Sequence, residues 1–165
     1  MKTLIVIDMQ KDFIDGSLGT KEAQAIVPKV KDKIKTYEQN GDRIIYTRDT
    51  HGDDYLDTAE GKKLPVKHCI MNTDGWQIPE ELLVENPFII NKPSFGYTNW
   101  WQFDFDEIEI VGLCTDICVV SNALILKALF PEIPVTVDSN CCAGVTPETH
   151  QAALKTMNMC QVTII

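Results

Sequence analysis

Short apolar runs rich in β-branched residues alternate along the chain with longer segments of helical character. Residues 2–8 are almost continuously apolar and end in a carboxylate, a pattern typical of a central parallel strand buried on both faces. Five further runs predict strands at residues 43–47, 88–91, 107–111, 134–138 and 161–165. We therefore expect a sheet of six strands.

Three segments between these runs predict helices. Residues 28–40 repeat apolar positions at helical spacing and end at Asn40-Gly41, residues 118–129 are apolar on almost every side, and Thr146-Pro147 begins a helix that runs to about residue 158. Residues 9–17 are predicted as a loop. Alternating strands and helices predict a three-layer α/β/α fold with a six-stranded parallel sheet, Rossmann-like, in the strand order 3-2-1-4-5-6.

Composition restricts the classes of protein and partner. A chain of 165 residues, 44% hydrophobic and 24% charged, predicts one globular domain over residues 1–165. No stretch is long and apolar enough to span a membrane, and the first strand is too short for an export signal, so we expect a cytoplasmic protein. The net charge of −9 makes nucleic acid and anionic membranes poor partners. The six cysteines are expected to be reduced thiols.

A cysteine follows the fourth strand at the predicted start of a helix. Gly112 is expected to break the strand, Thr115 to cap the helix, and Cys118 to lie in its first turn. Backbone N–H groups and the positive end of the helix favour a thiolate there and can stabilise an oxyanion, although the charge of Asp116 opposes the thiolate. Most free cysteines are small buried hydrophobic residues, and on this stretch alone we favour that interpretation.

Polar residues follow four of the predicted strands. Asp8, Asp49, Lys92 and Cys118 lie at or just after strand ends, so a parallel sheet can direct all four into one crevice. There Asp8 can take the proton of the thiol and return it to a leaving group, and Lys92 lowers the pKa of both. Taken singly, Asp8 is also explained as a strand-end cap and Lys92 as a solvated surface lysine.

Three motifs resemble those of the isochorismatase-like cysteine hydrolases, the superfamily that contains the nicotinamidases. They span nearly the whole chain in the family's order: Ile-Asp-Met-Gln-Lys-Asp-Phe at 7–13, Asn-Lys-Pro-Ser-Phe at 91–95 and Gly-Leu-Cys-Thr-Asp-Ile-Cys-Val at 112–119. The resemblance implies an Asp8, Lys92 and Cys118 triad. It also implies an oxyanion hole formed by the backbone amides of Cys114 and Cys118, and a cis peptide bond at Leu113-Cys114.

The long segment between the second and third strands carries the candidate metal ligands. It is roughly forty residues long, far more than a usual connection, and loops of that length often carry function. Asp49, His51 and His68 match the nicotinamidase metal ligands and would suit one divalent ion, Zn²⁺, Mn²⁺ or Fe²⁺. Without the resemblance, polar loop residues are ordinarily solvated surface. Cys69 is interpreted as a neighbour and not a ligand, and His150 as a surface residue.

The sequence departs from the family beside the second metal histidine. Nicotinamidases commonly carry a tryptophan there, whereas residues 64–67 are Leu-Pro-Val-Lys. Phe13, Phe95 and Trp100, with Tyr97 and Trp101, are candidates to line a flat apolar substrate pocket instead. Aromatic residues in such a segment are as often core packing.

The family resemblance and the expected grouping of Asp8, Lys92 and Cys118 together predict a cysteine amidohydrolase for a small carboxamide. Nicotinamide, cleaved to nicotinate and ammonia through a thioester, is the first candidate substrate. One alternative is hydrolysis of another C–N bond, in an N-carbamoyl or ureido compound. Isochorismate cleavage is disfavoured because that branch lacks the cysteine. A thiol-rich metal-binding or redox-sensing protein without turnover is supported only by Cys69 and Cys141-Cys142. The identity of the amide and of the metal, and whether the chain forms a homo-oligomer, stay open.

Overall fold

Six parallel strands form a single sheet in the computed structural model, which describes residues 1–165. Their order is β3-β2-β1-β4-β5-β6 and every neighbouring pair is parallel, which confirms the predicted fold class and strand order. The strands are β1 Lys2–Ile7, β2 Arg43–Asp49, β3 Phe88–Lys92, β4 Glu107–Leu113, β5 Val135–Ala143 and β6 Thr163–Ile164.

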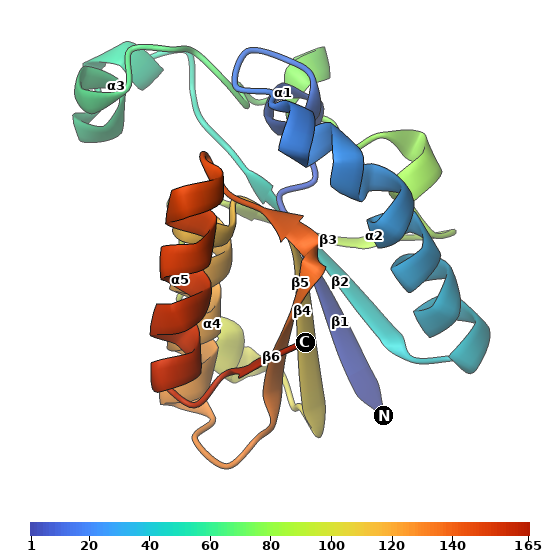
Figure 1. The fold of residues 1–165 in the computed structure, drawn as a ribbon. Coiled ribbons are helices and arrows are strands. Elements are labelled where there is room, and N and C mark those ends of the chain that lie inside the picture. The colour runs from blue at the N-terminus through green and yellow to red at the C-terminus, as the bar shows by residue number, and fades with distance from the viewer.

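Helices cover both faces of the sheet. They are α1 Lys11–Ile14, α2 Lys21–Asn40, α3 Ala59–Lys63, α4 Val120–Leu129 and α5 Pro147–Met159. Figure 1 shows α1 and α2 on one side and α4 and α5 on the other, with α3 projecting beyond the sheet. Alternation along β1 divides the core, because Leu4 and Val6 belong to the apolar cluster under α2, and Ile5 and Ile7 to the one under α4. No helix combines the length and apolar character needed to cross a bilayer.

The helix α2 is seven residues longer at its start than predicted. Its N-cap is Thr20, whose hydroxyl accepts a hydrogen bond from the Ala23 N–H at 3.0 Å, so that Pro28 lies inside the helix. Pro28 lacks an N–H, but the earlier turns are held by the burial of Ala23 and Ile26. The predicted end is confirmed, since Gly41 takes the left-handed conformation with φ of 71°. The predicted 9–17 loop contains the short helix α1.

The strand β4 continues through Gly112, which was expected to break it. Gly112 pairs with Ile7 of β1 and Cys142 of β5, and its φ is 121°. A Cβ atom at this position would lie 2.1 Å from the Ile7 carbonyl oxygen, so only glycine fits. The strand therefore extends to Leu113, and the Leu113-Cys114 peptide bond that follows is cis, as the resemblance implied.

Candidate active site

Asp8 lies directly after the central strand β1 and is fully buried. Its backbone has a φ of 47°, and its N–H donates to the Thr47 carbonyl oxygen of the adjacent strand at 3.2 Å. The Thr47 hydroxyl donates to Asp8 Oδ1 at 2.6 Å. Thr47 thus fixes one carboxylate oxygen and leaves the other, Oδ2, directed at other groups.

Lys92 is the last residue of the edge strand β3, and its side chain is completely buried. Its Nζ lies 2.6 Å from Asp8 Oδ2 and 3.5 Å from Cys118 Sγ, and it donates to the Ser94 carbonyl oxygen at 3.2 Å. The alternative that Lys92 is a solvated surface lysine is therefore wrong. The structure brings Asp8, Lys92 and Cys118 together, as the strand-end argument predicted.

Cys118 lies in the first helical turn after β4, as predicted, although the local geometry differs from the expectation. Residues Thr115–Val119 form a π-type turn that begins after Cys114, and α4 follows it. The Thr115 hydroxyl does not cap this turn but is hydrogen-bonded to His150 Nδ1 of α5 at 2.7 Å. His150 is half-buried, and this hydrogen bond joins α5 to the turn, a contact that the expected surface role did not include. The Asn122 side-chain amide donates to the Cys118 carbonyl oxygen at 2.8 Å and fixes the turn from α4.

Burial and two neighbouring charges act on the pKa of the Cys118 thiol. Burial raises the pKa of Cys118 well above its ordinary value, the Asp8 carboxylate raises it further, and the Lys92 ammonium lowers it. The pKa of Asp8 is also raised, chiefly by burial, while the Lys92 charge opposes the shift. Burial lowers the pKa of Lys92, but Asp8 and Cys118 outweigh it, so the pKa is raised and Lys92 stays charged. This net shift is opposite to the lowered thiol pKa expected from the sequence, although Lys92 acts in the predicted direction.

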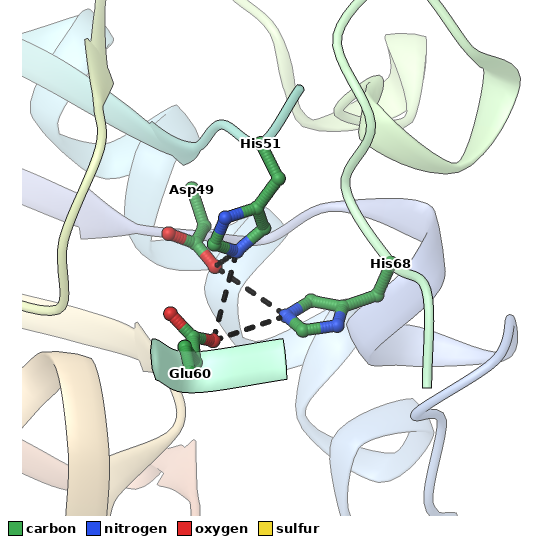
Figure 2. A group of neighbouring side chains, drawn as sticks. All are labelled: Asp49, His51, Glu60 and His68. Carbon is green, nitrogen blue, oxygen red and sulfur yellow. Dashed lines mark hydrogen bonds and ion pairs between the residues drawn. The ribbon is translucent and has the colours of Figure 1, made fainter. Parts of the chain in front are cut away.

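Four side chains next to this triad form a group with the chemistry of a divalent metal site. Figure 2 shows Asp49, His51, Glu60 and His68 pointing toward one another. Their four candidate ligand atoms all lie within 4.8 Å of one another. Oδ2 of Asp49 lies 2.9 Å from His51 Nε2 and 3.7 Å from His68 Nε2. Oε1 of Glu60 lies 3.7 Å and 3.6 Å from the same two nitrogens.

This group fits a borderline divalent ion such as Zn²⁺. Two imidazoles and two carboxylates are its usual donors, and separations of about 3 to 4 Å between donors suit bonds of about 2.0 to 2.2 Å to a shared ion. The Nδ1 atom of His68 is 2.8 Å from the Val66 carbonyl oxygen, a contact that orients the ring so that Nε2 faces the group. Asp49 stays ionised, because the imidazoles of His51 and His68 lower its pKa despite its burial.

Glu60 was missed by the sequence interpretation. It lies in α3, a five-residue helix inside the long connection between β2 and β3. Thr58 caps this helix by accepting from the Gly61 N–H at 3.0 Å, which sets the direction of Glu60. The spacing Thr-x-x-Gly after a polar loop is the one local signal of the helix, and it does not indicate that its glutamate meets Asp49.

The 7–13 motif supplies supports for the metal group. Gln10 is fully buried, and its side chain accepts from the Asp49 N–H at 2.7 Å and donates to the Asp49 carbonyl oxygen at 2.8 Å. Asp12 Oδ2 accepts from the Cys69 N–H at 2.8 Å, next to His68. The Cys69 thiol is buried and does not belong to the group, in agreement with its interpretation as a neighbour. Two polar residues of the first motif thus position both metal-bearing segments.

A pocket of about 600 Å³ opens onto Cys118 and the metal group. Phe13 and Phe95 line it, as predicted. Trp100 does not, because it is completely buried in the core under α4 and its Nε1 donates to Asn122 Oδ1 at 3.0 Å. The expectation that Trp100 forms a pocket wall is therefore wrong, and the core-packing alternative holds for this residue.

Comparisons with known proteins match most of this chain or nearly all of it. The isochorismatase domain family matches residues 2–165. A nicotinamidase of Saccharomyces cerevisiae is 27% identical over 84% of this chain and 87% of its own length, and a probable inactive nicotinamidase of Arabidopsis thaliana is 28% identical over 93% and 86%. The crystal structure of a Pyrococcus horikoshii pyrazinamidase in complex with zinc superposes with a TM-score of 0.86, at 26% identity over 99% of this chain and 98% of that one.

Proposed function

Because this chain belongs to the isochorismatase family, we propose that it is a cysteine amidohydrolase that cleaves the C–N bond of a small carboxamide, with nicotinamide as the first candidate. A relative described as a nicotinamidase and one described as a probable inactive nicotinamidase have nearly the same identity to this chain. Sequence identity therefore does not distinguish an active from an inactive enzyme, and the proposal rests on the geometry of the site. The observation that supports the proposal best is the position of the buried Lys92 ammonium, 2.6 Å from Asp8 and 3.5 Å from Cys118. Cys118 lines the same pocket as Asp49, Glu60 and His68 of the metal group.

In the proposed acylation, Asp8 takes the proton of the Cys118 thiol as sulfur attacks the amide carbon. Burial raises the pKa of both Asp8 and Cys118, so a free carboxylate and a free thiolate are both disfavoured here. Proton transfer from the thiol to Asp8 that is concerted with the attack of sulfur suits this environment. The backbone N–H groups of Cys114 and Cys118 hold the oxyanion. Asp8 then gives its proton to the nitrogen, the C–N bond breaks, and ammonia leaves a thioester.

Deacylation uses the same groups in reverse. Asp8 removes a proton from water, the water oxygen attacks the thioester carbon, and the C–S bond breaks to give the carboxylic acid and the regenerated thiol. Lys92 keeps its charge throughout and offsets the negative charge that moves between Asp8 and sulfur. Its place between the two groups makes it an electrostatic partner of the reaction and not a proton donor.

Asp49, His51, Glu60 and His68 would hold one divalent ion at the edge of the pocket. When bound, such an ion supplies a Lewis acid that can orient a substrate nitrogen or activate water. The zinc in the Pyrococcus horikoshii structure supports this choice of metal. The site residues of this chain supply two carboxylates for the ion, one more than the sequence predicted.

The thiol-rich alternative has less support in the structure than in the sequence. Cys141 and Cys142 are consecutive residues of β5, so their side chains point to opposite faces of the sheet. Each is buried in a different apolar cluster, Cys141 under α2 and Cys142 under α4 and α5. Their packing explains both residues without a redox role.

Ammonia release from nicotinamide tests the proposed function. Wild-type protein should release ammonia, and Cys118→Ala should release none while retaining its fold by circular dichroism. Cys160→Ala is the matched control, because Cys160 is exposed and lies outside the pocket. Activity that survives in Cys118→Ala would remove the cysteine mechanism, and no activity from the metal-loaded wild type on any carboxamide would remove the amidohydrolase.

A further inference from the structure

The pocket is much larger than a single-ring amide requires. Its volume is about 600 Å³, within the range of pockets that hold drug-sized ligands. Nicotinamide has about nine non-hydrogen atoms, and at roughly 20 to 30 Å³ each, compared with ~30 Å³ for a liquid water, it fills less than half of that space. The reactive groups therefore occupy one part of a longer cavity.

The buried and exposed lining residues divide the pocket into an inner polar end and an apolar mouth. Cys118, Asp49 and His68 are almost completely buried, which places them at the inner end. Three of the eleven large hydrophobic residues that are exposed on this chain line the same pocket, and they are Leu64 (39%), Phe95 (43%) and Val145 (52%). Single exposed apolar residues need no explanation, but a convergent set around a cavity marks a binding surface.

These apolar residues come from separate segments of the fold. Leu64 ends α3, Phe95 follows β3, and Val145 lies in the loop between β5 and α5. Leu18, before α2, and Ile117, in the turn of Cys118, line the pocket with them. The only charged lining residue outside the metal group is Lys63, whose side chain is exposed. A charged substituent would lose hydration in this mouth without a buried partner, whereas an apolar one gains from burial.

We propose that the substrates of this site are neutral carboxamides whose acyl group carries an apolar substituent beyond a single ring. The proposal rests on the proposed amidohydrolase function. The amide lies against Cys118 at the inner end, and the substituent extends outward between Leu64, Phe95 and Val145. The apolar contacts are the same in the ground state and the transition state, so they lower KM and leave kcat unchanged.

Steady-state kinetics on nicotinamide and its 5-alkyl derivatives, from methyl to butyl, test the proposal with the metal-loaded protein. Each added methylene should raise kcat/KM about threefold to fourfold, which corresponds to about 0.8 kcal/mol, entirely through KM. Over the four-carbon chain the gain should reach roughly a hundredfold. A derivative of equal length that ends in a carboxylate should lose this gain.

Variants at the mouth locate the effect. Val145→Asp and Phe95→Ser should each lower kcat/KM for the butyl derivative at least tenfold more than for nicotinamide. Met159→Asp is the matched control, because Met159 is an exposed apolar residue at the far end of α5, and it should change both substrates equally little.

The outcomes separate this proposal from the proposed function. Hydrolysis of nicotinamide with no gain along the alkyl series, or a preference for the carboxylate derivative, would overturn the substrate class and leave the amidohydrolase standing. A gain that persists in Val145→Asp and Phe95→Ser would overturn the assigned mouth. Hydrolysis of no amide in either series would overturn both proposals.

Discussion

Lys92 ends β3 and Asp8 directly follows β1, two strands that are separated by β2, yet Lys92 Nζ is 2.6 Å from Asp8 Oδ2. Lys92 can reach Asp8 because it pairs with Asp49, the last residue of β2. Its side chain therefore crosses the carboxyl end of β2. Thr47 of β2 holds the other oxygen of Asp8. The result is an ion pair with no exposed surface on either residue.

This ion pair predicts a coupling between Lys92 and Asp8 in stability. Lys92→Met should lower the free energy of unfolding by about 3 to 5 kcal/mol, because it leaves buried carboxylates without their cation. Adding Asp8→Asn should recover part of that loss by removing one of these charges. Urea unfolding of both single variants and the double variant measures the coupling, with Lys62→Met as an exposed control. A double variant no more stable than Lys92→Met would contradict the prediction.

The thiol of Cys118 should react with iodoacetamide more slowly at neutral pH than that of Cys160. Only the thiolate attacks, and burial together with the Asp8 carboxylate raises the pKa of Cys118, whereas Cys160 is exposed. The rate at Cys118 should therefore still be rising above pH 9, and Asp8→Asn should move the profile to lower pH. Mass spectrometry of partly labelled protein measures both rates. Labelling of Cys118 before Cys160 at pH 7 would contradict the prediction, because it would show that the helix N-terminus lowers the pKa of Cys118 more than burial raises it.

The sequence predicted the arrangement of the triad well because parallel topology determines it. Once strands 1, 3 and 4 are recognised, Asp8, Lys92 and Cys118 must all lie at the same edge of the sheet. The direction of the thiol pKa could not be predicted in the same way. It depends on how deeply Cys118 and Asp8 are buried, which follows from the packing of α4 and β3 and not from local spacing.

Glu60 and Trp100 show two further limits. Glu60 meets Asp49 only because the long connection brings α3 back to the end of β2, and no periodic pattern links α3 to β2. Trp100 and Phe95 belong to the set of aromatic residues that was expected to line the pocket. The Trp100 indole N–H finds a partner in Asn122, which lets the whole ring enter the core while Phe95 stays at the mouth.

The fourth ligand predicts that Glu60→Gln weakens metal binding. Removing one anionic donor should lower the affinity for Zn²⁺ roughly tenfold to a hundredfold, a loss comparable to that seen when ligand supports are removed. Asp57→Asn is the control, because Asp57 is exposed in the same connection and outside the group. Competition with a chromophoric chelator measures both affinities. Equal affinities of Glu60→Gln and the wild type would leave only the three ligands predicted from sequence.

Away from the site, the ion pair between Lys33 of α2 and Asp138 of β5 predicts that the free energy of unfolding decreases at acid pH. Its Nζ lies 2.9 Å from Asp138 Oδ2 of β5 and 2.5 Å from Glu109 Oε1 of β4, and all three side chains are largely buried. Burial tends to raise the pKa of Asp138, but the hydrogen bond and charge of Lys33 outweigh it, so the pKa is lowered. A carboxyl whose pKa is lower in the folded state stabilises the fold above its unfolded pKa of about 3.9, and loses that contribution as the pH falls through the folded value.

Asp138→Asn should therefore lower the free energy of unfolding by about 1 kcal/mol at pH 7, and by progressively less as the pH falls below about 4. Urea unfolding at pH 3, 4, 5 and 7 measures the difference between variant and wild type. Glu81→Gln is the matched control, because Glu81 pairs with Lys31 at 2.9 Å on the surface, where both side chains are about half exposed and the pair contributes little at any pH. The same loss for Asp138→Asn at pH 3 and pH 7 would mean that packing around Asn140 and Cys141, and not the charge of Asp138, explains its effect.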